Sequence, residues 1–283
     1  MTTRIGLIAG SGQFPLLFAR AAQQKGWEVY SAAYMKETDP ELVRFSASVE
    51  WLYVGQIKKL ISFFRRHHVC QAVMMGAIQK PRMFSNLRPD MKALALIAGM
   101  QHSHDDALLR RFADLLEKEG IKIMPSTLLL PDLLAPAGVW TRRKPSPAES
   151  RDIDIGWRIA KEIGRLDIGQ CVVIKSGSIL AVEAIDGTDS TIERGGRLGA
   201  GRAVVVKICK PHQDTRFDIP AVGLQTIEIM QSVQVKTLAV EAGKVVVFDR
   251  QEMIERADAY KMAIVAINDS NQEAQRPYGG EPL

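Results

Sequence analysis

The chain has 283 residues, of which 46% are hydrophobic and 24% charged, a balance typical of globular proteins and sufficient for two domains. The net charge of +5 is mild and only 6% of the residues are aromatic, so we expect no nucleic-acid partner. The sequence has neither a long uncharged apolar run nor a secretory pattern, which predicts a cytoplasmic protein. The three scattered cysteines are expected to be buried, reduced thiols.

The first elements predict a βαβ unit. Arg4–Ala9 has the pattern of a buried strand, and a loop follows at Gly10–Gly12. Pro15 lies where the first turn of a helix tolerates proline, and the periodic run Leu16–Lys25 continues that helix. Glu28–Ala33 is the second strand. Such a unit has parallel strands and a right-handed crossover.

Short strands and helices continue to alternate after this unit. Their expected ranges are Trp51–Val54, Ile57–His67, Ala72–Met75, Met91–Met100, Asp106–Lys118 and Ile121–Met124. Alternation of this kind indicates an open α/β sheet. We therefore predict an N-terminal Rossmann-like domain over residues 1–135.

The composition changes after residue 135, where three prolines and a basic triplet predict a Pro-rich linker over residues 136–150. A second, mixed α/β (α+β) domain is expected over residues 151–268, followed by a mobile tail over residues 269–283. Its expected elements are helices at Ile153–Arg165, Thr226–Ser232 and Gln251–Ala257, strands at Arg202–Cys209 and Met262–Ile267, and two hairpins, Cys171–Lys175 with Ile179–Glu183 and Lys236–Val240 with Val245–Phe248.

The glycine loop of the first domain is a candidate phosphate site. A loop between strand and helix presents backbone N–H groups at the positive end of the helix, which predicts substrate contacts from Gly10, Ser11, Gly12 and Gln13. A simple tight turn is the alternative. The dinucleotide pattern G-x-G-x-x-G is incomplete because Pro15 takes the third glycine position, which disfavours an NAD-dependent oxidoreductase.

Lys80 is a second candidate in the same domain. It follows the strand expected at Ala72–Met75, and ligands of open α/β sheets bind beyond the carboxyl ends of the strands. Its ammonium group could meet a phosphate there. A solvated loop is the alternative.

Acids and bases are concentrated between Val182 and Gly223. Carboxylates are ligands that Mg²⁺ prefers, and cations neutralise phosphoryl oxygens. Pro220 restricts Ile219 to extended geometry, which places Asp218 on a defined loop. Ordinary solvated loops, with Asp189 as a helix cap, are the alternative. The candidates are Asp218, Asp189 and Glu183 for the metal and Thr188, Lys207, Lys210 and Arg216 for the substrate.

Several runs resemble one enzyme family. They are Gly6–Gly12 with Pro15, Ile155–Gly164, Leu166–Gln170, Val182–Asp189 and Lys210–Gly223. With them the chain resembles the LpxI-type UDP-2,3-diacylglucosamine pyrophosphatases of lipid A biosynthesis over nearly its whole length before the tail.

The resemblance implies a two-domain hydrolase. Such enzymes cleave UDP-2,3-diacylglucosamine to UMP and 2,3-diacylglucosamine 1-phosphate (lipid X) with Mg²⁺. By similarity, Asp218 is the catalytically required aspartate, and Asp189 is expected to assist it. A lipid substrate implies peripheral association with the inner face of the cytoplasmic membrane, and a homodimer is expected as the commonest assembly. A non-catalytic carrier of a nucleotide-sugar lipid is the alternative.

Overall fold

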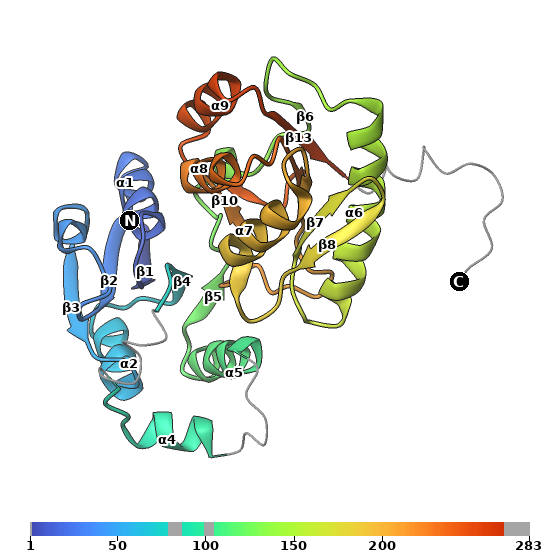
Figure 1. The fold of residues 1–283 in the computed structure, drawn as a ribbon. Coiled ribbons are helices and arrows are strands. Elements are labelled where there is room, and N and C mark those ends of the chain that lie inside the picture. The colour runs from blue at the N-terminus through green and yellow to red at the C-terminus, as the bar shows by residue number, and fades with distance from the viewer. Residues whose placement is uncertain (1, 79–86, 99–104, 269–283) are drawn as a thin grey trace. The chain divides into compact units, whose positions relative to one another are not determined.

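The computed structural model describes residues 2–78, 87–98 and 105–268, which form two compact units (Figure 1). Unit 1 comprises Met1–Pro131 together with Asp214–Asp218. Unit 2 comprises Asp132–Gln213 and Ile219–Leu283. A short segment of the C-terminal half of the chain therefore belongs to the N-terminal unit.

Unit 1 is built on a parallel five-stranded sheet of order β3-β2-β1-β4-β5. This order is that of a Rossmann-like sheet and confirms the predicted fold class. The central strand β1 is almost entirely apolar because both faces of the sheet are covered. The strands are β1 (Arg4–Ala9), β2 (Glu28–Tyr34), β3 (Ser48–Leu52), β4 (Gln71–Met75) and β5 (Lys122–Met124).

Helices α1 (Phe14–Gln24) and α2 (Ile57–Arg66) of unit 1 bury their apolar faces. Pro15 lies in the first turn of α1, as predicted. In α2 the apolar positions, including Phe63 and Phe64, are buried, whereas Lys59 and Arg66 point to the surface and pair with Glu50. The helices are α1 (Phe14–Gln24), α2 (Ile57–Arg66), α4 (Met91–Ile97) and α5 (Asp105–Lys118), with a 3₁₀ turn η1 (Pro40–Phe45).

Unit 2 contains a mixed six-stranded sheet of order β6-β13-β11-β9-β7-β8, which confirms the expected mixed class. Its centre is parallel, with β11 between β9 and β13, and its outer strands are antiparallel. The strands are β6 (Gly138–Val139), β7 (Cys171–Lys175), β8 (Ser178–Val182), β9 (Val204–Lys207), β11 (Thr237–Glu241) and β13 (Ala263–Ile267), and a separate pair consists of β10 (Ala221–Val222) and β12 (Val246–Val247).

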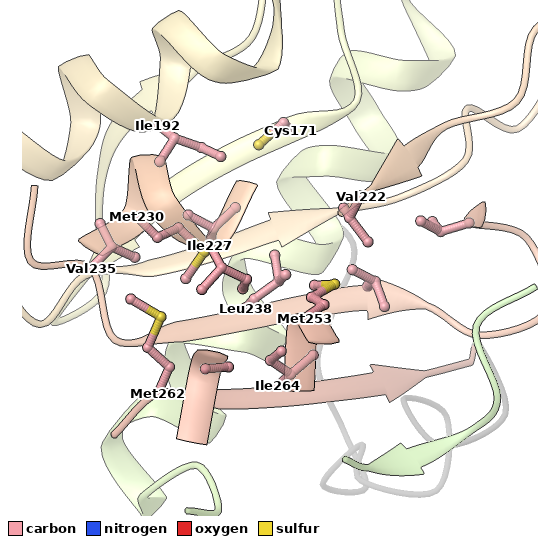
Figure 2. Packing of buried hydrophobic residues seen from close by; sticks show 14 of the residues in the cluster. Cys171, Ile192, Val222, Ile227, Met230, Val235, Leu238, Met253, Met262 and Ile264 are labelled. Carbon is pink, nitrogen blue, oxygen red and sulfur yellow. The ribbon is translucent and has the colours of Figure 1, made fainter. Parts of the chain in front are cut away.

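Four helices accompany this sheet. Buried side chains of α7, α8 and α9 pack against one face, and Figure 2 shows Ile192, Ile227 and Met253 converging there on Leu238 of β11. Trp157 of α6 covers the other face. A Cβ atom on Gly195 would lie 2.5 Å from Cβ of Val173, so only glycine lets α7 approach β7 this closely. The helices are α6 (Pro147–Arg165), α7 (Gly187–Gly199), α8 (Leu224–Ser232) and α9 (Arg250–Ala259).

Residues 136–150, predicted as a linker, are integrated into unit 2. Within this range β6 pairs with β13, and α6 begins at Pro147 behind a capping box formed by Ser146 and Glu149. Pro147 therefore lies in the first turn of a helix, and Gly138–Val139 form an edge strand of the sheet.

The first predicted hairpin, β7 with β8, is present, whereas the second is wrong. The N–H groups of Ser176 and Gly177 in the tight turn of the first donate to the buried carboxylate of Asp152. The segment after β11 instead forms β12, which pairs with β10 in another sheet. Because β11 is buried between two parallel strands, it has no edge left for a hairpin partner.

The prediction that all three cysteines are buried is wrong for Cys70, which is exposed.

Candidate active site

The carboxyl end of β9 carries a buried cation. Lys207 is only 7% exposed, and its Nζ atom donates to the carbonyl oxygen of Ala221 at 2.7 Å. Among the described residues no carboxylate pairs with this ammonium group. An ammonium has three donors, and a buried charge without a counter-ion is costly. Lys207 is therefore arranged to meet an anion.

Glu183, directly after β8, holds Thr188 at the start of α7 in place. Its Oε1 atom accepts a hydrogen bond from the hydroxyl of Thr188 at 3.0 Å, and its Oε2 accepts from the backbone N–H of Gln170 at 3.2 Å. The carboxylate is buried. Gly169 permits this arrangement, because a Cβ atom there would lie 2.2 Å from the carbonyl oxygen of Glu183.

Asp189 lies in the first turn of α7 and is exposed. Its Oδ2 atom accepts a hydrogen bond at 2.9 Å from the side-chain amide of Gln225, which lies in the first turn of α8. Two helix N-termini thus lie side by side, and both carry partial positive charge that favours an anion. We did not predict a role for Gln225 from the sequence, although a polar residue directly after Gly223 and at the start of a helix could have indicated one.

Cys171 of β7 lies between two of these charges. The N–H of Glu183 donates to the carbonyl of Cys171 at 2.8 Å, and Lys207 is the register partner of Cys171 on β9. Burial raises the pKa of the Cys171 thiol to about 12, the negative charge of Glu183 raises it as well, and the positive charge of Lys207 lowers it. The structure brings Glu183, Thr188, Asp189 and Lys207 together in unit 2, as the clustering in the sequence suggested.

Lys210 is engaged elsewhere. Its Nζ atom forms an ion pair with Asp167 at 2.8 Å, and its backbone N–H donates to the side chain of Gln213. Because Asp167 already neutralises its charge, Lys210 would attract an anionic ligand less strongly than Lys207 does.

The segment Asp214–Asp218 is anchored on unit 1 by Arg216. The guanidinium binds both carboxylate oxygens of Asp214, at 2.9 and 2.7 Å, and also Glu117 of α5 at 3.1 Å. The hydrogen bond from Arg216 lowers the pKa of Asp214, which keeps the pair ionised. Phe217 packs against the core of unit 1. Arg216 thus positions this segment, and its contact with substrate stays a prediction.

Asp218 ends the anchored segment. It is half-buried, and its backbone N–H donates to the carbonyl of Asp214 at 3.1 Å. It belongs to unit 1, whereas Glu183 and Asp189 belong to unit 2.

The glycine loop at the end of β1 is crossed by the loop after β4. Gly10 donates its N–H to Met75, and Ser11 donates both its N–H and its hydroxyl to the carbonyl of Ala77. A Cβ atom on Gly10 would lie 2.6 Å from that carbonyl oxygen. Two of the N–H groups expected to meet phosphate are therefore already bonded. Gly12, with φ of +93°, and Gln13, the N-cap of α1, are exposed. Lys80 lies outside the described residues.

No group of three or more His, Cys, Asp or Glu side chains within residues 2–78, 87–98 and 105–268 could hold a metal ion. A magnesium ion that binds together with substrate phosphates needs only one or two protein carboxylates. Asp189, an exposed carboxylate with Oδ2 engaged by Gln225, fits that simpler requirement. The residues present are therefore compatible with Mg²⁺ held partly by substrate.

A pocket of about 370 Å³ in unit 2 lies away from these residues, at the amino ends of β9 and β11. It is lined by three cations, Lys175, Arg202 and Lys236, among others. Lys175 donates to the carbonyl of Gly199 at the end of α7, and Lys236 donates to that of Tyr260 after α9. These lysines bind carbonyls at helix carboxyl ends, where positive charge is stabilising.

The fold and this arrangement define an α/β protein with a Rossmann-like unit and an anion-attracting edge in a second, mixed unit. The model of the LpxI N-terminal domain matches residues 4–133, and that of the LpxI C-terminal domain matches residues 136–265. The chain is also 32% identical over 276 residues to the UDP-2,3-diacylglucosamine pyrophosphatase LpxI of Caulobacter vibrioides, covering 94% of this chain and 98% of that protein. The chain belongs to the LpxI family.

Some solved structures are similar to part of the chain. The biotin carboxylase domain of Hydrogenobacter thermophilus 2-oxoglutarate carboxylase is 15% identical, with a TM-score of 0.27, over 63% of this chain and 36% of that one. Biotin carboxylase of Campylobacter jejuni is 10% identical, with a TM-score of 0.29, over 68% and 41%. The chain spans well under half of these proteins, and such scores say nothing about its activity.

Proposed function

We propose that the chain hydrolyses the diphosphate bond of UDP-2,3-diacylglucosamine to UMP and 2,3-diacylglucosamine 1-phosphate (lipid X) in lipid A biosynthesis. The observation that carries this proposal is the similarity to the Caulobacter vibrioides enzyme, which extends over nearly the full length of both chains. The buried, unpaired ammonium of Lys207 supports it from the structure, because a diphosphate supplies the missing negative charge.

In this reaction the residues of unit 2 bind phosphate. Lys207 and the N-termini of α7 and α8 stabilise the negative charge that grows on the phosphoryl oxygens as water adds and the bridging P–O bond breaks. Glu183 holds Thr188 in place at the start of α7. Water thus supplies the oxygen that ends on one phosphate, and its protons are shared between the products and solvent.

Asp218 is the proposed catalytic carboxylate. It takes part either as a metal ligand or as the base that accepts a proton from the attacking water. Its place on a segment anchored by the side chains of Arg216 and Phe217 and by the backbone carbonyl of Thr215 supports a precise role, since catalytic groups require fixed geometry.

Mg²⁺ is the proposed cofactor. In unit 2, Asp189 would hold it together with the substrate phosphates. When bound, the ion neutralises phosphate charge and orients the attacking water. None of the helices in the described part of the chain is long and apolar enough to cross a bilayer. We propose that the protein meets its diacylated substrate peripherally, at the inner face of the cytoplasmic membrane.

The test is incubation of the full chain with UDP-2,3-diacylglucosamine, with Mg²⁺ and with EDTA. UMP and lipid X should appear in equal amounts with Mg²⁺ and should be lost with EDTA. Binding of the glycolipid without release of UMP would instead identify a non-catalytic carrier. Undiminished release in EDTA would remove the metal from the proposal.

A further inference from the structure

The pocket at the amino ends of β9 and β11 is a cavity with positive charges and no acid in its wall. Its volume of about 370 Å³ is that of a small-molecule site. Lys175, Arg202 and Lys236 supply three positive charges, and Gln231 and Gln234 supply side-chain amides. All of the lining residues belong to unit 2, so the pocket lies wholly within one compact unit.

Within the part of the chain that the structure describes, none of these three cations pairs with a carboxylate. Lys175 donates to the carbonyl of Gly199, and Lys236 donates to the carbonyl of Tyr260 at 3.0 Å and to Oε1 of Gln231 at 3.3 Å. The guanidinium of Arg202 donates to no described residue. A cleft lined by charges of one sign concentrates counter-ions, so this pocket attracts anions.

Helix capping accounts for two of the cations but not for the third. Lys175 binds the carboxyl end of α7, and Lys236 binds that of α9. Because an ammonium has three donors, Lys175 keeps two of them and Lys236 keeps one. Arg202 forms no such bond, and its planar fork of donors matches two oxygens of a phosphate. The pocket therefore retains donors that the fold does not use.

The backbone at the rim of the pocket is held in an uncommon conformation. Ala200, Arg202 and Gln234 have φ values of +44°, +60° and +58°, although none of them is glycine. Left-handed backbone is unfavourable for residues with a Cβ atom and is frequently found at ligand sites. The N–H of Arg202 donates to the carbonyl of Gln234 at 2.9 Å, which ties two of these residues together. The strained rim thus presents the unpaired guanidinium.

The pocket is separate from the site proposed for catalysis. Lys207 is the last residue of β9, whereas Arg202 precedes the first, so an extended chain of roughly 16 Å separates the two. Lys175 lies at the same edge as Arg202 because β7 runs antiparallel to β9. A ligand in this pocket is therefore not held by Lys207.

The arrangement of the donors favours phosphate over carboxylate. Lys175 ends β7, Arg202 lies in the loop before β9, and Lys236 directly precedes β11, so the donors come from three separate segments. A carboxylate accepts hydrogen bonds near its own plane. A tetrahedral phosphoryl group accepts them from several directions, which matches donors that come from three segments.

We propose that Lys175, Arg202 and Lys236 form a second anion site, which binds a small phosphate compound with two or more negative charges. The site goes beyond the proposed function and does not depend on it. Its residues bind the ligand and take no part in cleavage of the glycolipid.

The experiment titrates inorganic diphosphate into the full chain with Lys207→Met, which removes the cation of the proposed active site, and follows binding by calorimetry. Diphosphate should still bind. Adding Arg202→Gln should weaken this binding about ten- to a hundredfold, because a charged, forked donor is lost. Arg197→Gln is the matched control, since it removes the same charge from an exposed position of α7 that pairs with Glu193. This control should bind diphosphate normally.

Two results of these titrations would overturn the proposal. Equal weakening by Arg202→Gln and Arg197→Gln would show that net charge alone attracts the anion. Citrate, a carboxylate anion of comparable charge, should bind to the Lys207→Met protein about tenfold more weakly than diphosphate. Equal affinity for citrate would overturn the assignment to phosphate compounds.

Thermal unfolding and turnover separate a binding role of Arg202 from other roles. Without ligand, the Tm of Arg202→Gln should equal that of the parent, because the guanidinium has no described partner to lose. UMP release from the glycolipid should also proceed at the parent rate. A Tm lowered by several degrees, or slower release, would assign Arg202 to the fold or to the reaction and would overturn the proposal. Since the titrations need no turnover, failure of the proposed activity would leave the anion site standing.

Discussion

The carboxyl edges of the two sheets differ in the sign of the charge that lacks a partner. In the described part of unit 1 it is the acid Glu37, in the turn after β2. In unit 2 it is the base Lys207, whereas the nearby buried acid Glu241 is paired with Lys161 at 2.7 Å and with Lys244 at 2.8 Å. An acid suits hydroxyl donors and an ammonium suits phosphoryl oxygens. At its own edge, unit 1 thus has a buried acceptor and unit 2 a buried donor.

Asp218 should show the largest effect. Asp218→Asn keeps the shape of the side chain but removes its charge, so kcat for UMP release should fall by about 10³-fold or more, whether the group is a base or a metal ligand. UDP binding should change little. Thr215→Ala, an exposed change in the same segment, should remain close to the parent. Near-normal turnover of Asp218→Asn would remove it from the mechanism.

Loss of the Lys207 ammonium should have the second-largest effect. Lys207→Met removes the ammonium but retains an apolar stem, so kcat/KM for UMP release should fall about 10²- to 10³-fold, the effect of losing one preorganised donor to a developing charge. Lys210→Met should cost less, because Asp167 already neutralises that cation. Equal losses in steady-state assays of the two variants would contradict the distinction between them.

The ion pair of Glu149 with Arg143 lies away from the proposed site, so its loss should affect stability alone. Glu149 accepts hydrogen bonds from Arg143, Thr237 and the N–H of Ser146, so Glu149→Gln should lower the free energy of unfolding of unit 2 by about 2–3 kcal/mol. Chemical denaturation measures this loss. Turnover per folded molecule should stay at the parent value, and a large fall in turnover would show that Glu149 affects the site.

The same carboxylate makes the stability of unit 2 depend on pH. Burial alone would raise the pKa of Glu149, but the hydrogen bonds from Arg143, Ser146 and Thr237 outweigh it and lower the pKa from 4.5 to about 2. The folded state therefore binds this proton more weakly than the unfolded state, and the stabilisation is present above pH 4.5 and lost as the pH falls towards 2. The difference between the parent and Glu149→Gln should shrink over that window. A difference independent of pH would contradict this account.

The smallest effect concerns the backbone of unit 1. Gly10→Ala places a Cβ atom 2.6 Å from the carbonyl oxygen of Ala77, so the two crossing loops must separate, at a cost of about 1–3 kcal/mol in stability, with weaker UDP binding. Gly12→Ala meets no atom within 4 Å and should cost only about 1 kcal/mol, for its positive φ. Thermal melts and UDP titrations compare the two. A larger loss of stability for Gly12→Ala than for Gly10→Ala would contradict the role assigned to the contact between these two loops.

The sequence by itself determined the βαβ pattern, the glycine loop, the first hairpin and the local grouping of Glu183, Thr188 and Asp189. These features depend on residues close together in the chain, through periodicity, turn chemistry and capping. Only the tertiary structure decided that Asp214–Asp218 joins unit 1, that residues 136–150 belong to unit 2 and contribute β6 to its sheet, and that Glu37 and Lys207 are buried with a missing counter-group. Burial and pairing depend on neighbours dozens of residues away, and local sequence does not specify those neighbours.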